Sequence, residues 1–372
     1  MNKLGFGLMR LPLRDPAVPS SIDIEETKRM VDAFIEGGFT YFDTAIMYCG
    51  GQSESAVKEV LTSRYPRDRY TLATKLHAGY LKTEEDRDRI FNEQREKTGV
   101  AFFDYYLLHA VCVSFYETYQ RLHCFEWLRE KKKAGLCKKI GFSFHDSAEF
   151  LDRVLTEQEG IDFVQLQMNY LDWESESVQS RACYEVARKH GVPVIVMEPV
   201  KGGTLANVPT SVCELFRACD KETSPASYAL RFVAELDGVM TVLSGMSNMA
   251  QLTDNMAHFS PLVPLSDREH AAILQATALI NGNTAIPCTG CAYCVDGCPK
   301  KIAIPEYFAV YNEDMRELEG KDWTPQYAYY DNLAETHGKA SDCIACRKCE
   351  RVCPQHLPIV KHLETVAGHF EI

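Results

Sequence analysis

The chain has 372 residues and a mass of 42.1 kDa, which leaves room for a barrel of roughly 250 residues and a small additional module. A hydrophobic content of 46% and a charged content of 25% are ordinary for a globular protein. The net charge of −12 argues against a nucleic-acid partner, because such a chain offers no basic field to attract phosphates.

The N-terminal segment and the cysteine content indicate a cellular compartment. MNKLGFGLMRLPL lacks the positively flanked apolar stretch of a signal peptide, and no segment approaches the roughly 18 consecutive apolar residues of a membrane span. Fifteen cysteines in a chain of this kind indicate metal or redox chemistry in a reducing compartment more than a disulfide framework. We therefore expect a cytoplasmic protein without a membrane segment.

Short apolar strands alternate with amphipathic helices over roughly the first 260 residues. The predicted strands, which are rich in β-branched and aromatic residues, cover 4–9, 40–45, 70–75, 104–109, 139–144, 162–167, 193–198 and 239–244. The predicted helices include 23–36, with acidic residues in its first turn, and 177–190, which a glycine follows. Eight such strands predict an α/β fold of the (β/α)8 TIM-barrel type. An open doubly wound sheet is the alternative, which the lack of a GxGxxG after the first strand disfavours.

Polar residues occur at the ends of three predicted strands. Asp43, Lys75 and His109 end the second, third and fourth strand. Catalytic residues of such barrels lie at the C-terminal ends of several strands. Their positions therefore support the barrel and a catalytic site together.

The composition changes at about residue 261, where a proline-containing segment leads into a predicted helix at 267–280. We place a boundary within 261–285, which divides the chain into a barrel at 1–262 and a smaller domain at 263–372. Within the smaller domain, 300–342 is expected to be an aromatic-rich, helical insertion.

The smaller domain contains the pattern CxxCxxCxxxCP twice. The pattern resembles the bacterial two-cluster ferredoxin signature, in which the fourth cysteine of each run binds the other cluster. The resemblance implies two 4Fe-4S clusters, the first held by Cys288, Cys291, Cys294 and Cys353, and the second by Cys343, Cys346, Cys349 and Cys298. A pair of structural zinc sites is the alternative, which the use of this spacing twice disfavours. A ferredoxin or flavodoxin is then the expected redox partner.

Three segments of the barrel, YFDTAIMYCGGQSE, LATKL and DYYLLH, together resemble the aldo-keto reductase family over roughly residues 1–260. The family's catalytic tetrad falls on Asp43, Tyr48, Lys75 and His109. The resemblance implies hydride transfer from the C4 atom of a nicotinamide to a small-molecule aldehyde or ketone, or the reverse oxidation of an alcohol.

The chemistry of these four residues is consistent with that reaction. A phenol with an ordinary pKa of about 10 is a poor acid near neutral pH, and a nearby ammonium group would lower this pKa. Tyr48 is therefore expected to donate the proton, with its pKa lowered by Lys75, which pairs with Asp43. His109 would orient and polarise the carbonyl group.

The nicotinamide contacts that the resemblance implies are less complete. Gln165 matches the family glutamine that binds the carboxamide, and Ser143 matches the serine of the family's GxSN element, in which Phe144 replaces the asparagine. Met197 stands where an aromatic residue normally stacks on the nicotinamide ring.

The segment LSGMSNMAQLTDN resembles the family loop that binds the adenosine phosphate. Its candidate contacts are Ser244, Gly245, Ser247, Gln251 and Asn255. NADPH-preferring relatives carry Lys and Arg where this chain has Gly245 and Gln251, so we expect NAD(H) or NADP(H) to bind without a strong preference for NADPH.

Two further interpretations remain open because a one-electron relay fits hydride transfer awkwardly. The clusters could feed single electrons to a bound flavin, or directly to the substrate, without a nicotinamide and with Tyr48 as the proton donor. Alternatively, the barrel could be a non-catalytic scaffold for an electron carrier, an interpretation that the intact tetrad disfavours.

Overall fold

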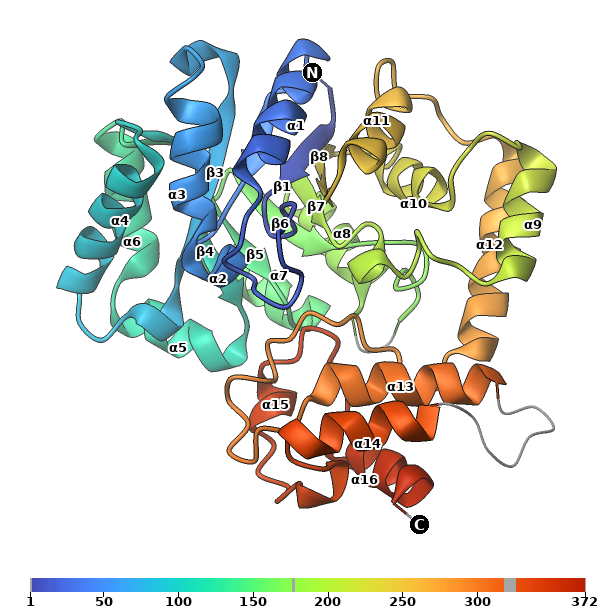
Figure 1. Cartoon of the computed structure of the whole chain (residues 1–372). Helices are drawn as coiled ribbons and strands as arrows, with labels where there is room; N and C mark the ends of the chain where they lie inside the picture. The colour runs from blue at the N-terminus through green and yellow to red at the C-terminus, as the bar shows by residue number, and fades with distance from the viewer. Residues whose placement is uncertain (1, 176–177, 318–325, 372) are drawn as a thin grey trace.

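A computed structural model describes residues 2–175, 178–317 and 326–371, and its N-terminal part is a closed barrel of parallel strands. Each strand pairs with the next along the chain, and the last pairs with the first, which confirms the predicted barrel and excludes the open sheet. The strands, shown in Figure 1, are β1 (Leu4–Gly7), β2 (Tyr41–Asp43), β3 (Thr71–His77), β4 (Phe103–Val111), β5 (Cys137–Phe144), β6 (Phe163–Gln167), β7 (Val194–Met197) and β8 (Val239–Gly245).

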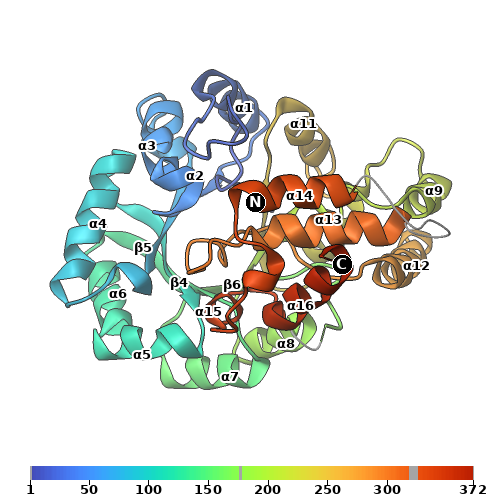
Figure 2. The same ribbon diagram turned by 60° about the horizontal axis from the view of Figure 1, so that its bottom comes forward.

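Helices surround the barrel and also build the C-terminal part (Figures 1 and 2). Those of the N-terminal part are α1 (Ile24–Glu36), α2 (Tyr48–Gly51), α3 (Ser53–Val57), α4 (Glu85–Thr98), α5 (Val113–Arg121), α6 (Cys124–Lys133), α7 (Ala148–Glu157), α8 (Ser180–Lys189), α9 (Thr210–Cys219), α10 (Pro225–Ala234) and α11 (Met249–Ala257). They are followed by α12 (Asp267–Asn283), α13 (Ile304–Glu317), α14 (Gln326–Thr336), α15 (Lys348–Arg351) and α16 (Ile359–Phe370). No helix in the described ranges is long and apolar enough to span a membrane.

Local sequence signals account for the ends of the two helices that were predicted in the barrel. Asp23 caps α1, since its carboxylate accepts a hydrogen bond from the backbone amide of Glu26 at 3.1 Å. The helix predicted at 177–190 begins at Ser180, and residue 177 lies outside the described residues. Gly191 has a φ of 68° just after it, a left-handed conformation that glycine adopts at little cost.

The C-terminal part has its own apolar core. Tyr307, Phe308, Tyr330, Leu363 and Phe370 are buried together where α13, α14 and α16 pack (Figure 1). The predicted insertion at 300–342 is therefore helical where it is described, because α13 and α14 belong to it; residues 318–325 lie outside the described residues.

Helix α12 connects the two parts and packs on the barrel side. Its buried residues Ala272, Ala276 and Ile280 share a core with Val212 and Phe216 of α9. The sequence-based division at 262/263, which assigns this helix to the smaller domain, stays a prediction.

The two cysteine runs repeat in backbone conformation as well as in sequence. Each cysteine from Cys343 onward lies 55 residues after its counterpart from Cys288 onward. Left-handed φ values recur at the same offset, at Gly290 and Ala345, Ala292 and Arg347, and Lys301 and His356. The two runs are thus folded as structural repeats.

A buried polar contact, centred on Gln355, joins the second repeat to the barrel. The side-chain oxygen of Gln355, two residues after Cys353, accepts hydrogen bonds from Lys201 at 3.2 Å and from Gln167 at 3.0 Å. Lys201 also forms a buried ion pair with Asp172, which Gln167 contacts at 3.0 Å. Burial makes an unpaired polar group costly here, so the contact fixes the C-terminal part over the strand ends (Figure 2).

We expect Gln355→Leu to loosen this attachment, because Lys201 and Gln167 lose an acceptor in a buried position, at a cost of about 1–3 kcal/mol. Hydrogen exchange in residues 288–296 and 352–357 should accelerate roughly tenfold or more, while exchange in α4 and α6 stays unchanged. Lys300→Leu, at the equivalent but exposed position of the first repeat, is the matched control. Equal exchange in Gln355→Leu and in the unmodified chain would contradict the role of this contact.

Candidate active site and iron–sulfur centres

The candidate catalytic residues form one layer of side chains inside the barrel. A lower layer is apolar and consists of Tyr41, Ala73, Leu107, Phe163, Ile195 and Leu243. Because side chains on a strand alternate, the residues two positions further along face the same interior. These residues are Asp43, Lys75, His109, Gln165, Met197 and Gly245, and all six line a single cavity, the strand-end cavity.

Lys75 and Asp43 form a buried ion pair at the base of this cavity. The Lys75 Nζ donates hydrogen bonds to the Asp43 carboxylate and, at 2.9 Å, to the backbone oxygen of Thr44. Both charged side chains are almost fully buried, so removal of either partner would leave an uncompensated charge. These contacts fix the position of the Lys75 ammonium group inside the barrel.

Tyr48 and His109 lie beside this pair. The Nζ of Lys75 lies 4.8 Å from the centroid of the Tyr48 ring, and the Tyr48 and His109 ring centroids are 6.0 Å apart. The hydroxyl of Tyr119 donates to the backbone oxygen of His109 at 2.6 Å and accepts from the amide of Ala78 at 2.9 Å. The structure therefore brings together all four residues of the predicted tetrad, although β3 and β4 continue past Lys75 and His109 to His77 and Val111.

The expected lowering of the Tyr48 pKa is wrong for this geometry. Burial raises the pKa of Tyr48 well above its ordinary value, and the carboxylates of Asp43 and Glu198 add to the increase. Burial is the main cause, and the charge of Lys75, which lies over the ring, is balanced by Asp43. The phenol is therefore protonated at neutral pH, as a proton donor requires.

The histidines of the site are neutral. Burial lowers the pKa of His109 well below its ordinary value, and the charges of Lys75, His77 and His145 lower it further. Burial also lowers the pKa of His77 to about 4. The Nδ1 atom of His109 is buried without a hydrogen-bond partner in the described structure, so a ligand in the cavity could satisfy it.

The predicted nicotinamide contacts all line the strand-end cavity. They are Ser143, Gln165, Met197, Ser244, Gly245, Ser247, Gln251 and Asn255. The Oε1 of Gln165 is buried without a described partner, which fits the binding of a carboxamide. Gln251 instead accepts a hydrogen bond from the Ser247 amide at 2.7 Å, and Asn255 donates to the Ser244 hydroxyl at 2.9 Å.

The sequence did not identify several residues that line this cavity. Arg10 packs its side chain against Gly245 and has no ion-pair partner in the described part of the chain. Tyr293 and Cys291 reach the cavity from the first cysteine run. No local pattern marks such residues, because only the docking of the two parts places them there.

A larger cavity, the outer cavity, joins the first at Tyr48, His109 and Tyr293. Its volume is about 1310 Å³, and its wall is mainly apolar. Phe115 contributes to the wall from the barrel, and Val295 contributes from the C-terminal part. A carbonyl compound could reach Tyr48 from this side while a dinucleotide occupies the strand-end cavity.

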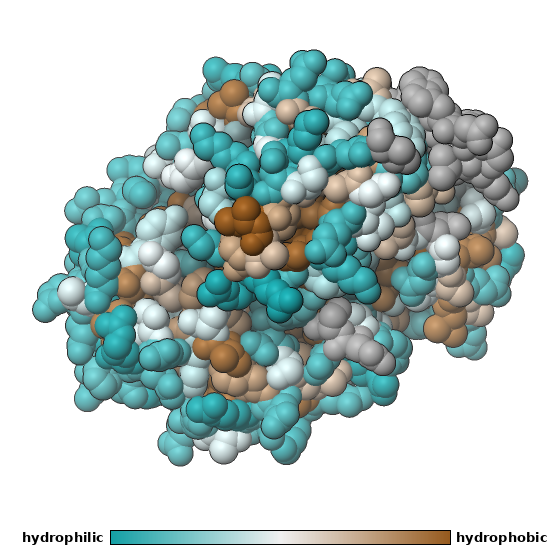
Figure 3. Space-filling model, turned by 90° about the horizontal axis from the view of Figure 1, so that it is seen from below, coloured by the Kyte–Doolittle hydropathy of each residue, from teal (hydrophilic) through white to brown (hydrophobic). Residues whose placement is uncertain are grey.

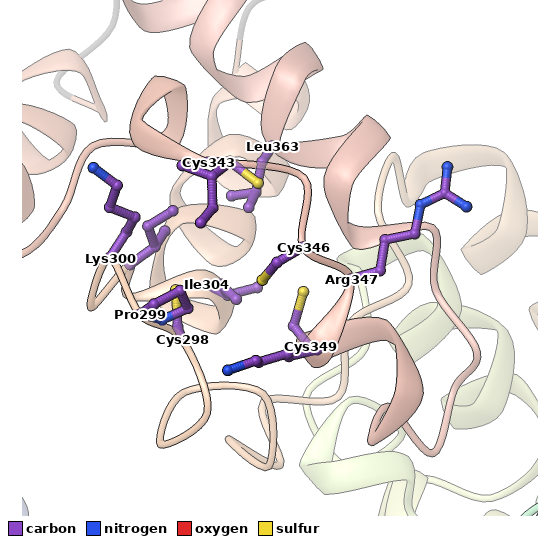
Figure 4. A pocket seen from close by; sticks show the side chains of 12 residues that line it. Cys298, Pro299, Lys300, Ile304, Cys343, Cys346, Arg347, Cys349 and Leu363 are labelled. Atoms are coloured by element: carbon purple, nitrogen blue, oxygen red, sulfur yellow. The ribbon is translucent and has the colours of Figure 1, made fainter. Parts of the chain in front are cut away.

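The eight cysteines of the two runs surround two separate small cavities. Cys288, Cys291, Cys294 and Cys353 line the cluster 1 cavity. Cys298, Cys343, Cys346 and Cys349 line the cluster 2 cavity (Figure 4). Each cavity thus combines three cysteines of one run with the last cysteine of the other, which matches the interleaved ligand sets expected from the sequence.

The donor chemistry of these cavities fits an iron–sulfur cluster. Four sulfur atoms and apolar neighbours such as Ile304 and Leu363 surround the cluster 2 cavity, as thiolate ligation of a cluster requires. Among the described residues, no three His, Cys, Asp or Glu side chains are arranged to hold a single metal ion.

Comparisons with known proteins agree with this geometry. A model of the aldo/keto reductase family matches residues 3–278, and a model of the 4Fe-4S dicluster domain matches residues 287–357. Among solved structures, the holo form of the aldo-keto reductase AKR11C1 from Bacillus halodurans matches with a TM-score of 0.59 and 23% identity, over 74% of this chain and 91% of that chain. An aldo-keto reductase from Klebsiella pneumoniae in complex with NADPH matches with a TM-score of 0.56 and 18% identity, over 75% and 90% of the two chains.

Curated relatives match only in part. The acetyl-CoA decarbonylase/synthase complex subunit alpha 1 of Methanosarcina barkeri is 31% identical over 85 residues, which are 23% of this chain and only 8% of that subunit. Norsolorinic acid reductase B of Dothistroma septosporum is 41% identical over 61 residues, 16% of each chain. The family model, in contrast, covers most of the chain and coincides with the closed barrel. The chain therefore belongs to the aldo/keto reductase family and carries a C-terminal 4Fe-4S dicluster domain.

Proposed function

We propose that this protein reduces a small-molecule carbonyl compound, or oxidises the corresponding alcohol, with NAD(P)H, while two 4Fe-4S clusters exchange electrons with a redox partner. The observation that carries the proposal is the composition of the strand-end cavity. One cavity contains the tetrad, the eight candidate nicotinamide contacts and Cys291, a candidate ligand of cluster 1.

Tyr48 is the proposed proton donor. Burial keeps its phenol protonated, so it can give a proton to the carbonyl oxygen as hydride reaches the carbonyl carbon. Lys75 would then stabilise the phenolate electrostatically, and Asp43 holds Lys75 in position. Neutral His109 would donate a hydrogen bond to the same carbonyl oxygen and orient it.

Gln165 and Ser143 are proposed to hold the nicotinamide, which would supply the hydride. Gln165 has an unsatisfied buried oxygen for the carboxamide, and Ser143 is fixed because its hydroxyl accepts a hydrogen bond from the Ala110 amide at 2.8 Å. The Klebsiella pneumoniae structure that shares this fold contains NADPH, which supports a nicotinamide.

The clusters are proposed to connect the barrel to one-electron carriers. Two clusters together store two electrons, the number that one carbonyl reduction consumes along with two protons. Because Cys291 lines both the strand-end cavity and the cluster 1 cavity, cluster 1 would lie beside a ligand bound in the strand-end cavity. The same observation favours a second candidate without a nicotinamide, in which cluster 1 would supply two electrons to the substrate one at a time. Tyr48 would still give the proton to the carbonyl oxygen, and solvent would supply the second proton, to the carbonyl carbon.

We expect Tyr48→Phe to lower kcat for carbonyl reduction by at least about a hundredfold, because phenylalanine has no proton to donate. Iron and sulfide content and cluster reduction by dithionite should not change. Tyr329→Phe, on the exposed face of α14, serves as the matched control. Full activity in Tyr48→Phe would contradict the proposed mechanism and favour the scaffold interpretation.

The pH profile follows from the same pKa shifts. The phenol of Tyr48 loses its proton only above its raised pKa, and His77 and His109 gain protons only below their lowered pKa values. We therefore expect kcat/KM for reduction to be constant between about pH 5 and pH 9. Alcohol oxidation needs the deprotonated phenol and should rise about tenfold per pH unit over this range. An activity limb for reduction near pH 6.5 would contradict the neutral histidines.

Cofactor preference depends on charge near the adenosine end. Gly245 and Gln251 supply no positive charge there, and the carboxylate of Asp254 also lines the cavity, so the dissociation constants of NADH and NADPH should agree within about tenfold. Gln251→Arg should strengthen NADPH binding selectively, by roughly tenfold. A hundredfold preference of the unmodified chain for NADPH, measured by titration, would show that another cation binds the 2′-phosphate.

A further inference from the structure

The two cysteine repeats differ in their contacts with the barrel and in their exposure to solvent. In the first repeat, Thr289 is buried, and its backbone oxygen lies so close to Gly202 of the barrel that a Cβ there would approach it to 2.3 Å. Tyr293, from the same repeat, lines the strand-end cavity. The residues 55 positions later are Ile344 and Lys348, and both are exposed.

The turns after the two Cys-Pro pairs show the same asymmetry. Gln355, beside the cluster 1 cysteine Cys353, is buried in the contact with Lys201. Its counterpart Lys300, beside the cluster 2 cysteine Cys298, is exposed and lines the cluster 2 cavity. The repeat surface that packs on the barrel at cluster 1 is therefore open to solvent at cluster 2.

This open surface carries positive charge. Lys300, Arg347 and Lys348 line the cluster 2 cavity, and Figure 4 shows Lys300 and Arg347 on opposite sides of the four cysteines. Within the described chain, Lys300 and Lys348 have no ion-pair partner, and the one partner of Arg347 is Glu350 at 3.8 Å. Ile344, 58% exposed, lines the same cavity and adds an apolar contact point. We call these four residues the cluster 2 rim.

The positive charge of the rim contrasts with the net charge of −12 of the whole chain. The face of the molecule that bears the C-terminal part is largely hydrophilic, with apolar areas near its centre (Figure 3). Local positive charge on an acidic protein orients an acidic partner by attraction at the rim and by repulsion elsewhere. An exposed apolar residue at the same cavity would then allow close contact.

Resting on the proposed function, we infer that the cluster 2 rim is the docking site of an acidic one-electron carrier protein. Each encounter transfers one electron from the reduced centre of the carrier to oxidised cluster 2, without a proton and without a bond being made or broken. Two encounters load the two clusters with two electrons, which is the number that one carbonyl reduction consumes in the route without a nicotinamide hydride. Cluster 1, which adjoins the strand-end cavity, is the exit side of this relay.

The test uses the anaerobic holoprotein and a reduced, acidic bacterial ferredoxin, with cluster reduction followed by stopped-flow absorbance in the absence of substrate. We expect the triple variant Lys300→Glu, Arg347→Glu and Lys348→Glu to lower the second-order rate constant about tenfold or more. The rate for the unmodified protein should fall as salt rises, and that of the triple variant should not.

Controls separate this proposal from the proposed function. Lys133→Glu at the end of α6, just before β5 and thus at the opposite end of the barrel, should leave the rate constant unchanged. Dithionite should reduce both clusters of the triple variant completely, since all eight cysteines are intact. Equal ferredoxin rates for the triple variant and the unmodified protein, or a change only in self-association, would overturn the docking site. A protein without iron would instead overturn the proposed function.

Discussion

The contact of Gln355 with Lys201 and Gln167 determines how the two parts of this protein work together. It attaches the turn after Cys353 to the ends of the barrel strands, in a buried position where each polar group depends on its partners. The attachment places Cys291 and Tyr293 in the strand-end cavity and leaves the other cysteine repeat facing solvent. The proposed direction of electron flow, from cluster 2 at the surface to cluster 1 at the barrel, rests on this attachment.

The barrel interior was largely predictable from the sequence. Strand alternation is a local property, so the apolar layer through Leu107 and Phe163 requires that residues two positions later face the same interior. His109 and Gln165 are those residues, and both line the cavity with the other members of the expected site. The resemblance of the two cysteine runs to the two-cluster ferredoxin signature implied the interleaved sets, and the cysteines line two cavities in that arrangement.

The remaining features depend on packing between distant segments. Tyr293 and Gln355 carry no local signal for contact with the barrel, since their roles arise only when the parts dock. The pKa shift of Tyr48 was predicted in the wrong direction because the sequence places a lysine nearby but does not reveal burial, or that Asp43 balances the charge of that lysine. Long-range burial, rather than residue identity, decided each of these points.

The central claim is that cluster 1, and not cluster 2, adjoins the catalytic cavity. Its most direct test is a redox titration of the anaerobic protein, monitored by electron paramagnetic resonance, with and without a saturating nicotinamide dinucleotide. Ligand binding in the cavity should change the environment of the cluster that includes Cys291, and so shift one midpoint potential while the other stays constant. If the dinucleotide binds and neither midpoint potential shifts, cluster 1 does not adjoin the catalytic cavity.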